Sequence, residues 1–251
     1  MKKIAFITGS EGQIGTELVK TFSLKGWECY GMDILKESQN SNLKNYINGD
    51  VRKRESFQSF FKLVSVDELR DGEILLINNA GVAVFTPSEE RTYEEYREVS
   101  DVNLFGPIIG TTEFYKYFVK PNEDSKEKKC SIINIASIYG LIAPNQQIYT
   151  DTPRNSSEIY GASKAGLIQL TKYFATRYAK DDLQINCIAP GGIYNENVQG
   201  SGFIENYAKL VPQNRLCMVK ELTNLIYSIV ESDCKYLTGQ TISLDGGMSA
   251  W

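Results

Sequence analysis

Histidine is absent from this sequence of 251 residues. Without it the chain has neither the base of a Ser-His-Asp triad nor a histidine-ligated zinc ion, and we expect no metal site. Any proton transfer must therefore fall to tyrosine, lysine, cysteine or a carboxylic acid.

Cysteine is scarce and long apolar runs are missing. The five cysteines include no CxxC pair, so we interpret them as small buried apolar residues in a reducing cytoplasm. No stretch approaches the roughly 18 apolar residues of a membrane span, and the apolar run in MKKIAFITGS is too short for a signal peptide. We expect a cytoplasmic protein without a membrane partner.

Long basic runs are missing too. The formal net charge is −4, and only KEKK at 126–129 is locally basic, with acidic residues around it. Such a chain does not track nucleic-acid phosphates, so we expect no nucleic-acid partner. The 42% hydrophobic and 23% charged residues are typical of a globular protein. No linker or repeat divides the chain, and we expect one domain over residues 1–251.

The N-terminal segment has the order strand, glycine-rich turn, helix. KIAFIT at 3–8 is an apolar, β-rich run typical of a buried parallel strand. In the turn that follows, Gly9, Gly12 and Gly15 permit a close approach of the backbone to a pyrophosphate at the helix N-terminus. A glycine turn can also be a simple connection. Asp33, at the end of a second strand, favours a dinucleotide site because it can accept hydrogen bonds from ribose hydroxyls.

Acidic residues near this turn favour NAD over NADP. Asp33 would repel a 2′-phosphate, Glu11 lies in the turn itself, and no arginine stands near Asp33. Lys36 is the one nearby cation. We expect NAD as the cofactor, with NADP as the less favoured alternative.

Two further strand ends carry candidate cofactor contacts. A strand near NYING leads to Asp50 and Val51, which we expect at the adenine. EILLINNAG is another buried strand and ends in Asn79, Ala80 and Gly81. Small and amide residues at the carboxyl end of a strand are suited to ligand contact in an open α/β sheet, although an ordinary Asn/Gly turn explains this segment equally well.

The stretch from 131 to 164 contains a candidate acid–base device. The apolar run IINIAS ends at Ser137, and Tyr160 lies four residues before Lys164, so these two share one face of a helix. A neighbouring ammonium would lower the pKa of the phenol from its ordinary value of about 10. Ser137 would hold a substrate oxygen. Taken alone, YxxxK is better explained as one turn of an ordinary amphipathic helix.

Two more segments border this device. Residues 92–119 predict a long helix with Asn103 in its middle, either at a surface position or holding a water for proton relay. The strand LQINCIAP at 183–190 leads into segment 192–215, which mixes polar residues, glycines and aromatics. We expect that segment to be a substrate lid.

Together these pieces resemble the classical short-chain dehydrogenase/reductases. The matching pieces occur in family order over almost the whole chain: TGSEGQIG at 8–15, Asp33, DV at 50–51, NNAG at 78–81, Asn103, Ser137, YGASK at 160–164, PG at 190–191 and LTGQTISLDGG at 237–247. The resemblance implies an α/β fold, namely a Rossmann-like, doubly wound parallel seven-stranded sheet with helices on both faces, a three-layer αβα sandwich. It also implies a nicotinamide cofactor and a homodimer or homotetramer.

The resemblance also implies the roles of site residues. Tyr160 would be the acid/base, Lys164 would bind the nicotinamide ribose, Ser137 would position the reacting oxygen, and Asn103 would support a relay water. With the candidates above, the expected cofactor contacts are Gly9, Gly12, Gln13, Ile14, Gly15, Asp33, Asp50, Val51, Asn79, Ala80, Gly81, Tyr160, Lys164, Pro190, Gly191, Ile193 and Asn195.

Three features depart from the family pattern. The turn is TGxxGxxG, with Gln13 where a glycine often stands, and Asn195 stands where many members have threonine. Tyr160 lies farther from the serine than is usual. Tyr149 lies at the usual distance, but Pro153 stands where its lysine partner is needed, so the Tyr/Lys pair selects Tyr160.

The extra residues form an insertion at 144–158, both ends of which lie at the mouth of the expected site. Tyr149 and Arg154 are its candidate substrate contacts, and Arg154 is suited to pair with a carboxylate or phosphate. A solvated surface loop is an equal alternative. With the glycine spacing, the insertion gives a looser resemblance to bacterial reductases of surface-polysaccharide and flagellin-glycan sugars.

We therefore expect an NAD-dependent oxidoreductase that transfers a hydride between nicotinamide C4 and a secondary alcohol or ketone, with a polar, sugar- or polyol-like small molecule as substrate. One alternative is a 3-ketoacyl-carrier-protein-type reductase, which Asp33 and the lack of a basic patch for an acidic carrier disfavour. Another is a catalytically silent NAD-binding sensor. The intact set of Asn103, Ser137, Tyr160 and Lys164 disfavours it.

Overall fold

Parallel strands form one sheet in the computed structural model, which describes residues 2–66, 71–122, 128–150, 155–232 and 234–250. The strands are β1 (Lys3–Thr8), β2 (Glu28–Asp33), β3 (Asn45–Asn48), β4 (Glu73–Asn78), β5 (Lys129–Ile135), β6 (Leu183–Pro190) and β7 (Thr241–Leu244). Their order across the seven-stranded sheet is β3-β2-β1-β4-β5-β6-β7. The predicted doubly wound, Rossmann-like sheet is confirmed.

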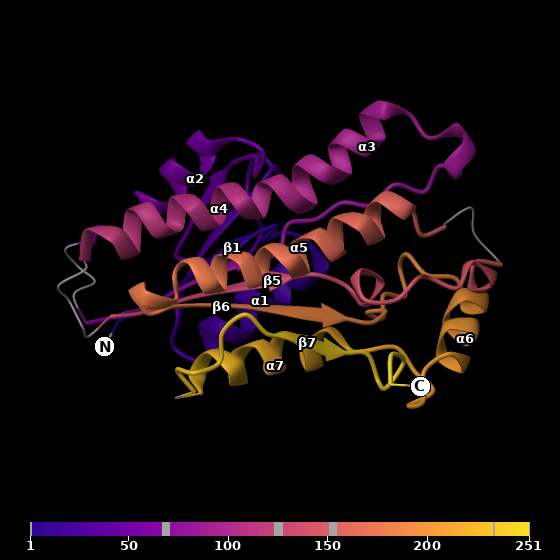
Figure 1. Cartoon of the computed structure of the whole chain (residues 1–251). Coiled ribbons are helices and arrows are strands. Elements are labelled where there is room, and N and C mark those ends of the chain that lie inside the picture. The colour runs from indigo at the N-terminus through magenta and orange to yellow at the C-terminus, as the bar shows by residue number, and fades with distance from the viewer. Residues whose placement is uncertain (1, 67–70, 123–127, 151–154, 233, 251) are drawn as a thin grey trace.

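Helices cover both faces of the sheet (Figure 1). They are α1 (Gln13–Leu24), α2 (Arg54–Phe61), α3 (Tyr93–Ser100), α4 (Gly106–Phe114), α5 (Glu158–Arg177), α6 (Ser201–Lys209) and α7 (Val219–Glu231). Helix α6 lies beyond the tips of the strands, near the C-terminus (Figure 1).

Alternate residues of β1 explain why the sheet has two helical layers. Ile4 and Phe6 belong to one buried cluster with side chains from α2, α4 and α5. Ala5 and Ile7 belong to another with side chains from α1 and α7. Because successive side chains of a strand point to opposite faces, a continuous apolar run such as KIAFIT needs cover on both. The predicted three-layer arrangement follows from this run.

The strand order reverses between β1 and β4, and the carboxyl ends of these two strands are tied together. The Asn79 Nδ2 donates to the carbonyl oxygens of Thr8 and Gly9, at 3.0 Å each. The Thr8 hydroxyl accepts the backbone N–H groups of Asn79 and Ala80, at 3.1 Å each. In open α/β sheets the ligand crevice lies outside the strand ends at this switch point.

The long helix expected over 92–119 contains two π-helical turns. Helix α3 leads into a π turn at Asp101–Phe105, and α4 leads into another at Tyr115–Val119. Such turns occur often at functional sites. Asn103 lies in the first π turn and is fully buried, so the alternative that placed it at the surface is wrong.

The cysteines are only in part the buried residues that we expected. Cys29, Cys130 and Cys187 are buried, but Cys217 is half-buried and Cys234 is exposed. Cys234 lies in the connection between α7 and β7, outside both apolar layers. Within the described part of the chain, no helix combines the length and the apolar character needed to cross a membrane.

Candidate active site

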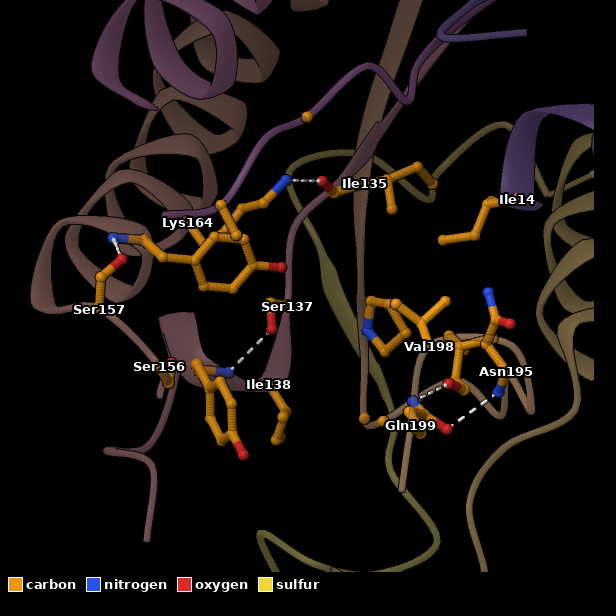
Figure 2. A pocket seen from close by; sticks show the side chains of 18 of the residues that line it. Ile14, Ile135, Ser137, Ile138, Ser156, Ser157, Lys164, Asn195, Val198 and Gln199 are labelled. Carbon is orange, nitrogen blue, oxygen red and sulfur yellow. Dashed lines mark hydrogen bonds between the residues drawn. The ribbon is translucent and has the colours of Figure 1, made fainter. Parts of the chain in front are cut away.

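A cavity of about 450 Å³ lies at the carboxyl ends of β5 and β6. Ser137 follows β5, Tyr160 and Lys164 lie on α5, and all three line the cavity. Figure 2 shows Ser137 and Lys164 on one side of it and Asn195, Val198 and Gln199 on the other. The structure thus brings the predicted acid–base residues to one wall of one cavity.

Local backbone structure positions these side chains. Ser137 is the extended residue before the short 3-10 turn Ile138–Gly140, and its Oγ accepts the Tyr139 N–H at 3.2 Å. Ser157 caps α5, where its Oγ accepts the Tyr160 N–H at 3.3 Å. An N-cap of this kind stabilises the first helical turn, which is the turn that carries Tyr160.

Lys164 reaches from α5 to the end of β5. It is buried, its Nζ donates to the carbonyl oxygen of Ile135 at 2.8 Å (Figure 2), and Nζ lies 5.8 Å from the centre of the Tyr160 ring. Burial lowers the pKa of Lys164 to about 8, because the charged form loses water.

The pKa of Tyr160 differs from our expectation. We expected the Lys164 ammonium to lower it, but in the structure it is raised. The main cause is burial of the hydroxyl, and a hydrogen bond with the Ser137 side chain acts in the opposite direction. Desolvation of the Tyr160 hydroxyl therefore outweighs its hydrogen bond with Ser137.

Asn103 joins the segment after β4 to α5. Its Oδ1 accepts the Val82 N–H at 2.8 Å, and its Nδ2 donates to the Val82 carbonyl at 2.9 Å and to the Ser163 Oγ at 3.2 Å. A Cβ on Gly81 would lie 3.4 Å from both the Asn103 Oδ1 and the Lys164 Nζ. The side chain of Asn103 therefore positions the wall beside Lys164, and its link to a relay water stays a prediction.

A second cavity of about 350 Å³ continues the first across the switch point. The predicted cofactor residues divide between the two. Four of them line both cavities: Gln13, Ile14, Asn79 and Gly81. The first cavity is further lined by Pro190, Gly191, Ile193 and Asn195. The second is further lined by Gly9, Gly12, Asp33, Asp50, Val51 and Ala80. Gly15 lies in the first turn of α1 beneath this groove.

The glycine turn is built for a close approach. Gly9 has φ +64°, and a Cβ there would lie 2.8 Å from the Cα of Ala80. A Cβ on Gly15 would overlap the carbonyl oxygen of Gly9. Gly12 precedes α1 and gives it no side-chain cap, so the first N–H groups of the helix are left for an anionic ligand.

The end of the second cavity near Asp33 is acidic, and hydrogen bonds hold two carboxylates in place there. The Asp33 carboxylate accepts the N–H groups of Glu11 at 3.1 Å and of Leu35 at 3.4 Å. The Glu11 carboxylate accepts the Ser38 hydroxyl at 2.7 Å and the Gln39 N–H at 3.1 Å.

Of the cationic side chains near this end, one is bound to another carboxylate and one is exposed. Arg52 lines the groove, but its guanidinium binds the Asp50 carboxylate at 2.7 Å, and Lys36 is exposed. Arg52 is a lining residue that the sequence reasoning missed, although it directly follows the DV pair.

Gln13 and Asn195, which depart from the family pattern, contact each other. Gln13 Nε2 donates to the Tyr194 carbonyl at 2.7 Å, and Asn195 Nδ2 donates to Gln13 Oε1 at 3.1 Å. Gln199 in turn accepts the Asn195 N–H at 2.9 Å (Figure 2). These amides link the start of α1 to the segment before α6.

The insertion and the expected lid pack together on the substrate side. Ile148 and Tyr149 belong to an apolar cluster with Phe203 and Tyr207 of α6, and Tyr149 lines the cavity. Arg154 lies outside the described residues. The sequence reasoning missed Tyr139 and Tyr207 as lining residues, although an aromatic residue two positions after Ser137 was a usable signal.

Comparisons with known proteins agree with this architecture. The chain is 29% identical over 253 residues to an uncharacterized oxidoreductase of Schizosaccharomyces pombe, covering 99% of this chain and 91% of the relative. It is 27% identical over 260 residues to the post-translational flagellin modification protein A of Campylobacter coli, covering 98% and 97%.

A solved structure is also similar. The short chain dehydrogenase of Leptospira borgpetersenii with bound NAD⁺ has a TM-score of 0.86 and 32% identity, covering 99% of this chain and 93% of its own. The family model for short chain dehydrogenases matches residues 3–202. With a match over most of its length, the chain belongs to the short chain dehydrogenase family.

Proposed function

We propose that this protein is an NAD-dependent oxidoreductase that interconverts a secondary alcohol and a ketone on a neutral, polar substrate similar to a sugar or polyol. One observation carries the proposal: Ser137, Tyr160 and Lys164 line a cavity that continues into a groove ending at Asp33. The similar Leptospira dehydrogenase holds NAD⁺.

The residues present fit a dinucleotide. The uncapped start of α1 and the close approach at Gly9 suit a pyrophosphate, and Val51 and Asp50 would border the adenine. Lys164, Gly191 and Asn195 would hold the nicotinamide half. When bound, the nicotinamide accepts or supplies the hydride.

The protein supplies proton transfer and orientation. In oxidation the carbinol carbon loses a hydride with its C–H electron pair, the C=O bond forms, and the hydroxyl proton passes to Tyr160 in its phenolate form. Reduction reverses both transfers. The raised pKa of Tyr160 favours the neutral phenol, which is the form that donates a proton to a ketone. Ser137 holds the reacting oxygen.

The acidic end of the groove supports NAD over NADP. Asp33 and Glu11 stand together there, and their hydrogen bonds hold the 34–39 segment against the turn. A 2′-phosphate would meet two carboxylates, and like charges brought together cost several kcal/mol.

The lining supports a neutral substrate. Among the described residues that line the 450 Å³ cavity, Lys164 is the one with a charged side chain, and the others are apolar, aromatic, amide or hydroxyl residues. Apart from Lys164, a carboxylate or phosphate would find no cationic side chain among these residues. The relative named for flagellin modification supports the looser resemblance to sugar reductases. A homodimer or homotetramer stays a prediction.

Substitution of Tyr160 tests the proposal. We expect Tyr160→Phe to lower kcat about 10²- to 10⁴-fold, the usual effect of removing a general acid or base, while NADH still binds. Turnover is followed at 340 nm (NADH absorbance) over sugars, polyols and ketoacyl thioesters, and NADH binding by fluorescence. Tyr236→Phe, at a fully exposed position, is the control.

Two results would contradict the proposal. Full turnover by Tyr160→Phe would remove the assigned acid/base. Tight NAD binding by the wild type with no turnover on any of these substrates would support the silent sensor instead.

A further inference from the structure

Three tyrosines outside the acid–base set line the same cavity: Tyr139, Tyr149 and Tyr207, here named the tyrosine subsite. Tyr139 lies in the 3-10 turn after Ser137, Tyr149 follows the 3-10 turn Gln146–Ile148 of the insertion, and Tyr207 lies on α6. Three separate segments of the chain thus each place a phenol at this cavity.

The hydroxyl of Tyr139 is buried and has no hydrogen-bond partner among the described residues. A buried hydroxyl in that condition costs free energy, and such a group in a native structure calls for an explanation. Burial raises the pKa of Tyr139, and Tyr149 and Tyr207 raise it further. The phenol of Tyr139 is therefore neutral at pH 7 and able to donate.

The other two phenols are held by packing. The ring of Tyr149 stacks on Phe203, with centroids 5.4 Å apart. The Tyr207 hydroxyl accepts the Gly192 N–H at 2.5 Å, and a Cβ on Gly192 would lie 2.8 Å from the Tyr207 ring. Rings fixed in this way lose little conformational entropy when a ligand binds.

The subsite is close to the reacting oxygen. Tyr139 is two residues beyond Ser137, and the pKa of Tyr160, raised mainly by burial, is raised further by Tyr149. Tyr149 has an electrostatic effect on both Tyr139 and Tyr160, and all three line the same cavity. A phenol both donates and accepts, as an alcohol does, so this wall matches hydroxyl groups rather than ions.

We propose that the tyrosine subsite binds a hydroxyl on the carbon next to the reacting one, so that the substrate is a vicinal diol or the matching hydroxyketone. The proposal rests on the proposed function, because Ser137 and Tyr160 must hold the reacting oxygen. Tyr139 is the principal donor, since its buried hydroxyl interacts with the Tyr149 phenol without a hydrogen bond of good geometry in the described structure.

A matched pair of alcohols tests this inference. Trans-cyclohexane-1,2-diol and cyclohexanol differ only in the second hydroxyl. We expect the wild type to have a kcat/KM at least about tenfold higher for the diol, because a site built to hydrogen-bond a hydroxyl rejects the analogue that lacks it. Tyr139→Phe should lower the ratio of kcat/KM for the diol to kcat/KM for cyclohexanol to near one. Tyr173→Phe, on the exposed side of α5, should change neither value.

Binding provides a readout that does not need turnover. Diol binding to the enzyme saturated with NADH is followed by nicotinamide fluorescence, with wild type, Tyr139→Phe and Tyr173→Phe side by side. We expect the diol to bind about tenfold more weakly to Tyr139→Phe and unchanged to Tyr173→Phe.

The outcomes separate the two proposals. An equal loss on both alcohols in Tyr139→Phe, or no preference of the wild type for the diol in turnover and binding, would overturn the subsite and leave the oxidoreductase intact. Diol binding that depends on Tyr139, with no oxidation of any alcohol or reduction of any ketone, would support the subsite and overturn the proposed function.

Discussion

Asp33 is the residue on which we expect cofactor choice to depend most directly. Its carboxylate does not stand alone, because it receives the backbone N–H of Glu11, whose own carboxylate is bound to Ser38 and Gln39. Two negative groups and a folded segment therefore occupy the place where a 2′-phosphate would be recognised. Sequence reasoning identified both acidic residues, but only the structure shows that the Glu11 N–H donates to the Asp33 carboxylate.

Removing the charge of Asp33 should weaken the choice of NAD. We expect Asp33→Asn to raise the ratio of NADP to NAD affinity by about tenfold or more, because one like-charge contact is lost while an amide oxygen can still accept the Glu11 N–H. Equilibrium binding of the two reduced cofactors measures the ratio.

Glu37→Gln is the matched control for Asp33→Asn. It removes one negative charge from an exposed position in the same segment, and Glu37 does not line the groove. An equal change of the ratio in both variants would mean that general charge, and not the position of Asp33, decides the preference.

At the scale of elements, the start of α1 and the segment before α6 meet at the cavity. Gln13 holds this segment through the Tyr194 carbonyl and the Asn195 amide, and both Gln13 and Asn195 line the cavity. The contact lies at the cavity in which we place the cofactor, so we expect it to hold the two segments together there.

Breaking this contact should speed cofactor release. We expect Gln13→Ala to raise the dissociation rate of NADH about two- to tenfold, because exposed hydrogen bonds contribute roughly 0.5–1.5 kcal/mol each. Stopped-flow displacement of NADH measures the rate.

Asn197→Ala is the control for Gln13→Ala. The Asn197 side chain is exposed, and its backbone N–H, which alanine retains, donates to the Asn195 Oδ1 at 3.1 Å. An unchanged dissociation rate in Gln13→Ala would show that the contact does not limit release.

The π turn at Asp101–Phe105 is an element-scale feature that the sequence did not reveal. Asparagine is an indifferent helix former, so the sequence pattern left two alternatives open for Asn103, a surface position or a position at the site. In the structure the π turn directs the Asn103 amide inward. Its Oδ1 accepts the Val82 N–H, and its Nδ2 donates to the Ser163 Oγ.

Across the whole molecule, one buried cation ties distant elements to the helix that carries Tyr160. The Arg91 side chain is fully buried and binds Glu158, in the first turn of α5, and the Thr86 carbonyl. Tyr96 and Ser88 donate to the same carboxylate at 2.8 and 3.0 Å. The bond with Arg91 is the main reason that the pKa of Glu158 falls to about 2.

This network should make stability depend on acid pH. Because the folded-state pKa of Glu158 lies below its unfolded value, its contribution is fully present above about pH 4.5 and is lost as the pH falls toward 2. The carboxylate side chain is 49% exposed, so solvent keeps the contribution to about 1 kcal/mol or less.

We expect Glu158→Gln to melt about 2–4 °C below the wild type at pH 7, with the gap narrowing between pH 4.5 and pH 3. Scanning calorimetry measures the melting temperatures, and Glu196→Gln, at an exposed position, is the control. A gap that stays constant down to pH 3 would show that Glu158 does not titrate in this way.

The sequence by itself determined the order of strands and helices, the glycine turn and the Tyr160/Lys164 pair. Each of these depends on local periodicity or on spacing within one helix. Taken together they gave the family resemblance, and the structure shows the seven-stranded parallel sheet that the resemblance implies. Only the tertiary structure decided the rest. The contact between Gln13 and Asn195 joins residues 182 positions apart, the tyrosine subsite gathers three segments, and burial reversed the expected shift of the Tyr160 pKa. Long-range packing and loss of water arise only when the chain is folded, so no local pattern encodes them.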